Sequence, residues 1–404
     1  MKIYQRKKRI YLDHAATTPT DPRVVRTMVP YFSKVFGNPS SLHETGFKAK
    51  KALDSARQKI ANFIKAAPEE IIFTSGGTEA NNTALKGVFY ALDLPGKHFI
   101  TSKIEHHAVL EPAEFLEKQG GEVTYLPVDK KGIIDTVKLK QALRDETVLI
   151  SIMHANNEIG TIQPIKEIGS LIKAEKERRK KEKINIPLYF HTDAVQTFGH
   201  LPLNVEELGV DLLSASAHKF YGPKGVGLLY LKKGIKIVPW LQGGEHEQNR
   251  RASTENISGI VGFARAVELA EQEMEKENKR LIKLRDYFIN KILSGIKGSY
   301  LNGHAQMRLP NNVNVSLAGL EGESMLIDLD RFGIDCSTGS ACTSTSLKPS
   351  HVMMAISVKP ELSHSSLRFT LGRGTKKRDL DYTFKKLKLV VQRLRKISAL
   401  KINN

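Results

Sequence analysis

A lysine stands next to a histidine in SASAHKFYGPKG, residues 214–225, directly after the apolar run VDLLS. That run predicts a strand, so a charged residue at its end needs a reason. Lys219 could simply extend its ammonium group to solvent. It could also serve as an amine nucleophile whose pKa is lowered by its surroundings. This stretch leaves both interpretations open, and the other strand ends of the chain bear on the choice.

A glycine turn follows another predicted strand in IIFTSGGTEANN, residues 71–82. Gly76 and Gly77 allow the backbone close approach to a ligand, and a helix that begins near Thr78 offers free N–H groups and a positive dipole end. These features are those of a phosphate cradle. A glycine turn with a threonine cap forms equally well without a ligand, and the stretch matches neither the Walker nor the dinucleotide motif.

Polar side chains also end the apolar runs in FHTDAVQ, residues 190–196, and HANNEIG, residues 154–160. Asp193 is either a helix cap or an acid that keeps the ring nitrogen of a ligand protonated. Gln196 lies three residues further on, and Asn157 stands where it could contact a ring substituent. Only a ligand at this position would distinguish the two interpretations of Asp193.

A fifth strand end, SKIEHHAVL, carries His106 and His107. Either histidine could bind a metal, but no second cluster at suitable spacing supports one. A flat ring stacked on a flat ligand suits the position better. One ligand would use all five strand ends. It is an aromatic heterocycle with a phosphate, a ring nitrogen that needs an acid and an aldehyde that needs a lysine. That ligand is pyridoxal phosphate.

The chain has two cysteines, Cys336 and Cys342, in CSTGSACTSTSLKPS, residues 336–350. So few cysteines exclude a disulfide framework, which fits a reducing compartment. Small polar residues surround Cys342 and favour an exposed loop with a reactive thiol over a buried one. Cys336 follows the apolar segment RFGID and is predicted to be buried and inert.

The net charge of +19 allows an acidic partner, but the basic residues lie mostly on predicted helices such as residues 173–184 and 383–396. Aromatic side chains do not interleave with them as a stacking surface would require, so direct binding of nucleic acid is not expected. No apolar run reaches the length of a membrane span, and the basic N-terminus lacks the apolar core of a signal peptide. We therefore expect a cytoplasmic protein without a membrane partner.

Seven apolar, β-rich runs separated by helical segments fill about residues 70–232. This alternation predicts an α/β fold with a seven-stranded, mostly parallel sheet, in which ligands bind beyond the carboxyl ends of the strands. Residues 262–293 predict one long amphipathic helix or two joined ones. This helix leads into a second, smaller α+β domain with strands within residues 311–319 and 365–372 and a terminal helix.

Ten stretches, in order from about residue 10 to the last helix, resemble the NifS/IscS-type cysteine desulfurases; among them are YLDHAATTP, FGNPSSLHETG, FTSGGTEANN, HTDAVQ, HKFYGPKGVGLLY and STGSACTS. The resemblance implies a pyridoxal phosphate enzyme of fold-type I, aspartate-aminotransferase-like and of aminotransferase class V, that acts as a homodimer. It also implies a large cofactor-binding domain at residues 16–262 and a small domain formed by residues 1–15 and 263–404, which carries the cysteine loop.

The resemblance further implies that L-cysteine is converted to L-alanine, with a persulfide on Cys342. Sulfur would pass to an acceptor protein such as an iron–sulfur scaffold, with tRNA thiolation as a further destination. No resident metal is implied, although Cys342 could transiently ligate a nascent iron–sulfur cluster.

Site roles follow from the same resemblance, residue by residue. Lys219 forms the Schiff base, Asp193 pairs with the ring nitrogen and Gln196 with the phenolic oxygen. His106 stacks on the ring and moves protons, and Asn157 contacts the cofactor ring or the substrate. The phosphate is held by Gly77, Thr78, Ser216 and His218, with Thr254 from the partner subunit. Arg368, helped by Asn38, binds the substrate carboxylate, and Cys342 is the nucleophile.

Two other functions remain compatible with these residues. A selenocysteine lyase or another pyridoxal phosphate β-lyase would share the cofactor site, but selenium can leave without a thiol nucleophile, so a strict need for Cys342 separates the two. A non-catalytic basic binding protein on a retained enzyme fold would bind tRNA or a scaffold. A yellow colour and alanine release would exclude it.

Overall fold

The computed structural model describes residues 9–338 and 349–397, and Cys342 therefore lies outside the described residues. Its largest element is a sheet of seven strands in the order β2-β8-β7-β6-β5-β3-β4. Their bounds are β2 Ile71–Thr74, β3 His98–Ser102, β4 Glu122–Leu126, β5 Thr147–Ser151, β6 Tyr189–Asp193, β7 Leu212–Ser216 and β8 Gly227–Leu231. Five neighbouring strands, β4, β3, β5, β6 and β7, are parallel, and β8 is antiparallel to both β7 and β2. The predicted seven-stranded, mostly parallel α/β sheet is thus confirmed.

The strands form because their side chains are apolar on both faces, as a sheet covered by helices on both sides requires. Neighbouring residues along a strand join different core clusters: Phe73 packs on one face and Ile72 on the other. Leu213 and Leu212 divide in the same way. Only β4, at the edge, mixes exposed and buried positions.

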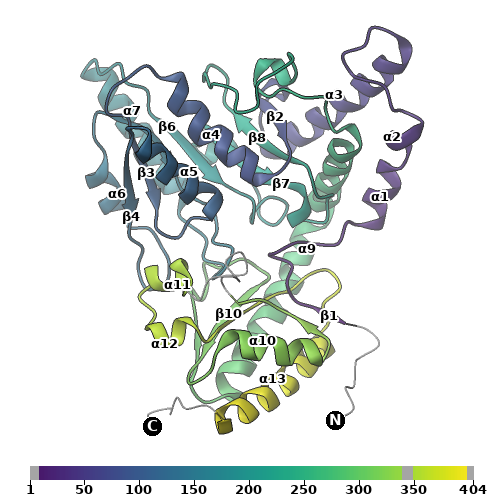
Figure 1. Ribbon diagram of the computed structural model, residues 1–404, viewed down its shortest axis with the longest axis vertical. Coiled ribbons are helices and arrows are strands. Elements are labelled where there is room, and N and C mark those ends of the chain that lie inside the picture. The colour runs from purple at the N-terminus through teal and green to yellow at the C-terminus, as the bar shows by residue number, and fades with distance from the viewer. Residues whose placement is uncertain (1–8, 339–348, 398–404) are drawn as a thin grey trace.

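Helices cover both faces of the sheet (Figure 1). One apolar cluster joins the sheet to α4 and α5, and the other joins it to α3, α7 and the start of α9. The helices of this body are α1 Pro22–Met28, α2 Pro30–Ser33, α3 Glu44–Ile64, α4 Gly77–Ala91, α5 His107–Lys118, α6 Thr136–Ala142, α7 Ile165–Lys181 and α8 Val205–Leu208, with short 3₁₀ turns at η1 Pro68–Glu70, η2 Ala217–Lys219 and η3 Glu247–Asn249.

A second, smaller body has its own apolar cluster below the main sheet (Figure 1). It contains an antiparallel sheet in the order β12-β10-β9 and a parallel pair formed by β1 and β11. Its elements are β1 Ile10–Tyr11, β9 Ser299–Leu301, β10 Asn312–Leu317, α10 Gly322–Arg331, β11 Ile334–Asp335, α11 His351–Ala355, α12 Pro360–Ser363, β12 Ser366–Thr370 and α13 Lys377–Ile397.

One helix, α9 Ile257–Gly295, runs through both bodies without a break (Figure 1). Its side chains up to Ala270 pack in a cluster of the large sheet, and those from Leu281 onward pack in the cluster of the smaller body. The sequence allowed one long helix or two joined ones, and the structure has one that begins five residues earlier than predicted. The predicted domain boundary after residue 262 falls inside this helix and stays a prediction.

Within the described residues, no helix combines the length and the apolar character that crossing a membrane demands.

Candidate active site

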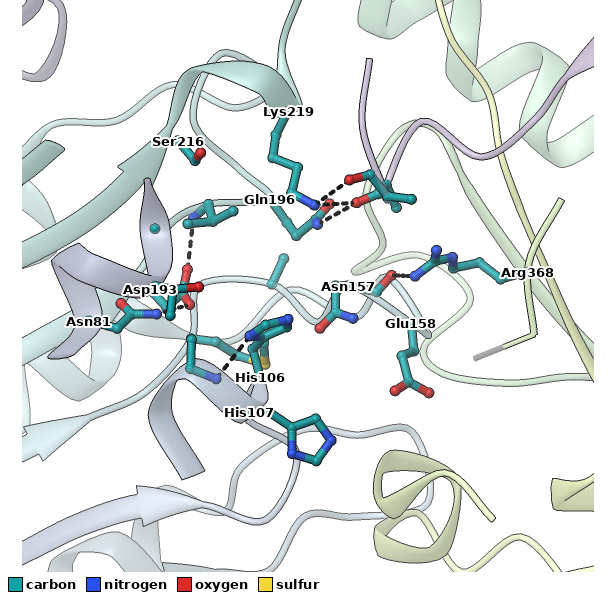
Figure 2. A pocket seen from close by; sticks show the side chains of 18 of the residues that line it. Asn81, His106, His107, Asn157, Glu158, Asp193, Gln196, Ser216, Lys219 and Arg368 are labelled. Atoms are coloured by element: carbon teal, nitrogen blue, oxygen red, sulfur yellow. Dashed lines mark hydrogen bonds between the residues drawn. The ribbon is translucent and has the colours of Figure 1, made fainter. Parts of the chain in front are cut away.

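A cavity of about 490 Å³ opens beyond the carboxyl ends of β5, β6 and β7, facing the smaller body. Figure 2 shows Lys219, Asp193 and Arg368 reaching it from different sides. Ten of the predicted site residues line it, namely Gly77, Thr78, His106, Asn157, Asp193, Gln196, Ser216, His218, Lys219 and Arg368. All of them except Arg368, which comes from the smaller body, meet because parallel strands end at one edge of the sheet, where ligands bind in folds of this kind.

Lys219 stands at the end of η2, the turn that follows β7. Its Nζ donates hydrogen bonds to the carbonyl oxygens of Ala15 and Ala16, each at 2.8 Å. The amine therefore lies at the cavity and does not extend to solvent, and its role as an amine nucleophile stays a prediction. Nδ1 of its neighbour His218 lies 3.0 Å from Thr17 Oγ1, and burial lowers the pKa of His218 to about 4.

Asp193 ends β6 with both carboxylate oxygens occupied by protein donors. Oδ2 accepts a hydrogen bond from Asn81 Nδ2 at 2.7 Å, and Oδ1 accepts one from the backbone N–H of Val195 at 2.9 Å. These two bonds orient the carboxylate while leaving further lone pairs for a cationic ring nitrogen. Nearby, Gln196 Nε2 donates to Ala15 O at 3.1 Å, so this carbonyl serves both Gln196 and Lys219.

The start of α4 meets the cavity at Gly77 and Thr78. A Cβ on Gly77 would lie 2.5 Å from Val195 Cγ2, so only glycine lets the helix approach the segment after β6 this closely. The first N–H groups of a helix have no partner inside it and attract anions. Ser216, at the end of β7, borders the same spot, because its side chain lies within 4 Å of the Cβ positions that Gly76 and Gly77 lack.

His106 caps the N-terminus of α5. Its Nδ1 accepts a hydrogen bond from the backbone N–H of Ala108 at 3.0 Å, so in the neutral ring the proton resides on Nε2. Burial lowers the pKa of His106, with the charge of Lys219 acting in the same direction and that of Asp193 opposing it. A neutral imidazole that carries its proton on Nε2 can both stack on a flat ring and pass on a proton.

Arg368, on β12 of the smaller body, closes the opposite side of the cavity. Its Nη2 donates to Asp13 Oδ1 at 2.8 Å and its Nη1 donates to the carbonyl oxygen of Asn157 at 3.0 Å. The Nε atom is buried without a hydrogen-bond partner in the structure. A fixed guanidinium with an unsatisfied N–H is suited to binding a carboxylate.

Two of the predicted residues are not brought to this cavity within one chain. Asn38 is exposed, and its Oδ1 accepts a hydrogen bond from the N–H of Ser40 at 2.9 Å. Thr254 is exposed as well, in the segment before α9. Cys336 is buried, as predicted, and burial raises the pKa of its thiol far above the ordinary value.

Sequence reasoning missed several side chains at the cavity, among them Asn81, Glu158, Ser350 and His351. Asn81 had a usable signal, since it lies three residues after Thr78 and therefore on the same face of a helix. Glu158 follows Asn157 directly. Ser350 and His351 have no local pattern that could have revealed them.

Behind His106 lies a buried acid, Glu105, that was also missed. Its carboxylate accepts hydrogen bonds from Ser102 Oγ at 2.6 Å and from the N–H of Met153 at 3.0 Å. Burial raises its pKa to about 8. Its carbonyl oxygen lies 2.8 Å from His351 Nε2, which ties α11 to the start of α5.

The donor set of the cavity fits pyridoxal phosphate. It offers an amine for an aldehyde, a held carboxylate for a ring nitrogen, an imidazole for a ring face and a glycine helix start for a phosphate. In residues 9–338 and 349–397 no group of three or more His, Cys, Asp or Glu side chains has an arrangement that could hold a metal ion.

Comparisons with known proteins agree with this geometry. The family described as aminotransferase class-V matches residues 10–383. The "Cysteine desulfurase IscS" of Dictyoglomus turgidum is 57% identical over 395 residues, covering 98% of both chains. That of Methanosarcina thermophila is 52% identical over 393 residues, covering 97% of this chain and 94% of its own.

Solved structures are similar over nearly the whole length. A "NIFS-LIKE PROTEIN" superposes with a TM-score of 0.88 at 36% identity, covering 96% of this chain and 100% of its own. A structure described as "SspA in complex with cysteine" has a TM-score of 0.78 at 35% identity, covering 90% of this chain and 98% of its own.

Proposed function

Because the chain belongs to the aminotransferase class-V family, and within it to the pyridoxal phosphate-dependent cysteine desulfurases, we propose that Lys219, Asp193 and His106 act on its cofactor and that Cys342 takes the sulfur. The observation that carries this proposal is the convergence of the Lys219 amine, the Asp193 carboxylate and the Arg368 guanidinium on one cavity. Cys342 lies outside the described residues, and its role rests on the family motif STGSACTS.

The cofactor is held by residues at several strand ends. Gly77, Thr78, Ser216 and His218 bind its phosphate, joined by Thr254 of a second subunit. Lys219 binds its aldehyde carbon, Asp193 keeps its ring nitrogen protonated, and Gln196 donates to its phenolic oxygen. When bound, pyridoxal phosphate supplies a ring that takes up the electron pair left behind when the substrate loses its α-proton.

The protein side chains then move protons and sulfur. Arg368 holds the carboxylate of L-cysteine, with Asn38 and Asn157 as further contacts. The Lys219 amine would take the α-proton, and His106 would exchange a proton through Nε2. The Cys342 thiolate attacks the substrate sulfur, so an S–S bond forms while the substrate C–S bond breaks. L-Cysteine and the Cys342 thiol thereby become L-alanine and a Cys342 persulfide, and no external oxidant is consumed.

The working protein is a homodimer in this proposal. Six large apolar side chains between residues 25 and 47 are strongly exposed in the single chain: Val25 44%, Val29 56%, Phe32 66%, Phe36 69%, Leu42 90% and Phe47 59%. An apolar surface of this kind marks an interaction site. Asn38 lies among them in the sequence, which supports its delivery to a cavity of the partner subunit.

The persulfide sulfur goes to an acceptor protein. An iron–sulfur scaffold is the acceptor we propose, with tRNA thiolation as a further destination and Cys342 as a transient ligand of a nascent cluster. The site of action is the cytoplasm. Nucleic acid is not a direct partner in this proposal.

The test uses the purified holoenzyme and its Cys342→Ser and Lys219→Ala variants. Cys342→Ser should bind cofactor and cysteine, seen as a spectral change, yet release almost no alanine and gain no sulfur by mass spectrometry. Lys219→Ala should lose turnover, whereas Lys224→Ala, an exposed lysine outside the cavity lining, serves as the matched control. Alanine release from Cys342→Ser would contradict the proposal and indicate a lyase of the selenocysteine type, which needs no thiol nucleophile.

A further inference from the structure

The helix start that we propose for the cofactor phosphate carries an acidic side chain of its own. Glu79 lies in the first turn of α4, directly after Thr78. Its Oε2 accepts a hydrogen bond from the backbone N–H of Ser75 at 2.7 Å, so the carboxylate lies against the glycine turn at residues 75–77. A carboxylate and a phosphate are both attracted to the positive end of a helix. Without compensation, the charge of Glu79 would therefore repel a phosphate bound there.

An arginine from a distant part of the chain compensates this charge. Arg251 Nε donates to Glu79 Oε1 at 2.8 Å, and its Nη2 donates to Oε2 at 3.3 Å. Only 17% of the Arg251 side chain and 9% of the Glu79 side chain are exposed, so salt screens this pair weakly. Burial alone would raise the pKa of Glu79, but the hydrogen bonds from Arg251 and Ser75 bring it below the ordinary value. The carboxylate is therefore charged at neutral pH.

The turn that leads to Arg251 has an unusual backbone. In η3, the φ angles of Glu247, Gln248 and Asn249 are 47°, 57° and 62°. Residues with a side chain rarely adopt this left-handed conformation, and it persists only where surrounding contacts hold it. Backbone strain of this kind is concentrated at functional sites, so the contacts that hold this turn need a reason.

The buried side chain of Glu247 holds the turn. Its carboxylate accepts hydrogen bonds from Arg57 Nη1 at 2.8 Å and Arg57 Nη2 at 2.7 Å, and from the backbone N–H of Phe73 at 3.0 Å. These bonds attach the turn to α3 and to β2. Arg251, four residues further on, is thereby brought to Glu79 in a fixed position.

We propose that Arg251 is a positioning residue for the cofactor phosphate: by binding Glu79, it neutralises the carboxylate and holds it against the glycine turn. The start of α4 then stays favourable to a phosphate. Neither Glu79 nor Arg251 lines the cavity, so the pair acts through the helix start. This inference rests on the proposed phosphate site at Gly77 and Thr78 and adds to it the pair of side chains that sets its charge.

The first test compares two ligands. The full-length protein, freed of cofactor, is titrated with pyridoxal phosphate and separately with pyridoxal, which has the same ring and aldehyde but no phosphate. Arg251→Gln should weaken binding of pyridoxal phosphate about tenfold, the effect of one unpaired charge within ~12 Å at an effective dielectric constant of ~20. Binding of pyridoxal should stay nearly unchanged. The visible absorbance of the bound ligand gives both dissociation constants.

A second set of variants separates the charge from the contact. Glu79→Gln removes the repelling charge and keeps an oxygen for the Ser75 N–H, so it should bind pyridoxal phosphate at least as tightly as the parent protein. Combined with Arg251→Gln, it should restore most of the lost affinity, because no unpaired charge remains. Arg251→Lys keeps the positive charge and should lose less than Arg251→Gln.

Three results would overturn the inference. One is normal binding of pyridoxal phosphate by Arg251→Gln. Another is a loss in the combined variant as large as in Arg251→Gln alone. The third is an equal loss for pyridoxal and pyridoxal phosphate in Arg251→Gln, because the pair would then be only structural. If Arg251→Gln does not fold, Glu79→Gln decides, and a loss of pyridoxal phosphate affinity in that variant overturns the inference.

Arg178→Gln is the matched control. Arg178 Nε and Nη2 donate to Glu175 on α7 at 2.9 and 2.8 Å, outside the cavity lining. This variant also removes one positive charge and should leave both affinities unchanged. An equal loss of pyridoxal phosphate affinity in Arg178→Gln would overturn the inference, because the net charge of the protein would then account for the effect.

Thr78→Val tests the proposed phosphate site itself. If this variant binds pyridoxal phosphate normally, the proposed site fails, and the inference fails with it. If Thr78→Val binds pyridoxal phosphate weakly while Arg251→Gln binds it normally, only the inference is overturned. The two failures are therefore distinguishable.

Discussion

Replacing Asp193 by asparagine should lower both turnover and stability, and the two effects have different physical causes. The carboxylate accepts one hydrogen bond on each oxygen, from Asn81 Nδ2 and from the N–H of Val195. An asparagine side chain has only one oxygen, so whichever way its amide turns, one of the two donors faces an NH₂ group. A buried donor without a partner costs about 1–3 kcal/mol of unfolding free energy.

The loss of charge acts on the chemistry. A neutral amide no longer keeps the cofactor ring nitrogen protonated, so turnover should fall at least ~100-fold, the lower range for a group that manages protons. Denaturant unfolding measures the stability change, and an alanine assay with the cofactor content determined by absorbance measures turnover.

A second substitution separates the two effects. In Asp193→Asn combined with Asn81→Asp, the new amide can donate to a carboxylate at position 81, so most of the lost stability should return. Turnover should stay low, because the charge now lies on α4 and not at the end of β6. Near-normal turnover of Asp193→Asn with full cofactor loading would refute the pairing of Asp193 with the cofactor ring nitrogen. Recovery of turnover in the combined variant would refute the requirement that the carboxylate lie at the end of β6.

Three further predictions follow from buried groups. Arg368→Lys should raise KM for cysteine about tenfold or more, because a lysine cannot keep the contacts to Asp13 and Asn157 and also bind a carboxylate with two N–H groups. Steady-state kinetics at unchanged cofactor content measure this. An unchanged KM counts against Arg368 as the residue that binds the substrate carboxylate. Burial lowers the pKa of His154 to about 4 and that of His191 to about 3, below the ordinary value of 6.5. Below pH 6.5 the unfolded chain therefore binds more protons than the folded one. The free energy of unfolding should fall as the pH drops from about 6.5 towards 4, by up to ~3 kcal/mol for His154 alone. Urea unfolding at a series of pH values should show a smaller loss in His154→Gln than in the parent protein. Cys336→Ser should keep most of its activity and lose about 1–2 kcal/mol of unfolding free energy, since it buries a hydroxyl in an apolar cluster. Loss of persulfide formation in this variant would contradict Cys342 as the nucleophile.

Most of the residues around the cavity were predictable, because each one stands at or after the end of a strand that is recognisable from its apolar sequence. Asp193 is the last residue of β6, and Lys219 and His106 follow the ends of β7 and β3 within a few residues; the side chains of β7 and β3 are buried from end to end. Parallel strands place their carboxyl ends at one edge, so the types of these residues could be combined into one ligand before any contact was known.

The start of α9 shows where local patterns mislead. The amphipathic pattern was recognised from residue 262, but the helix begins at Ile257, where Asn256 Oδ1 caps it by accepting from the N–H of Gly259. A cap is a single side chain, and it leaves a weaker trace in the sequence than a repeated apolar face.

The sequence by itself determined the α/β architecture and the chemical groups of the cavity, because both follow from residues close together along the chain. Tertiary structure alone decided which distant side chains hold those groups. Ser350 meets Glu158 across 192 positions, and Arg368 meets Asp13 across 355. Such pairs arise only where two separately folded layers pack against each other, and neither partner changes the local periodicity from which elements are predicted.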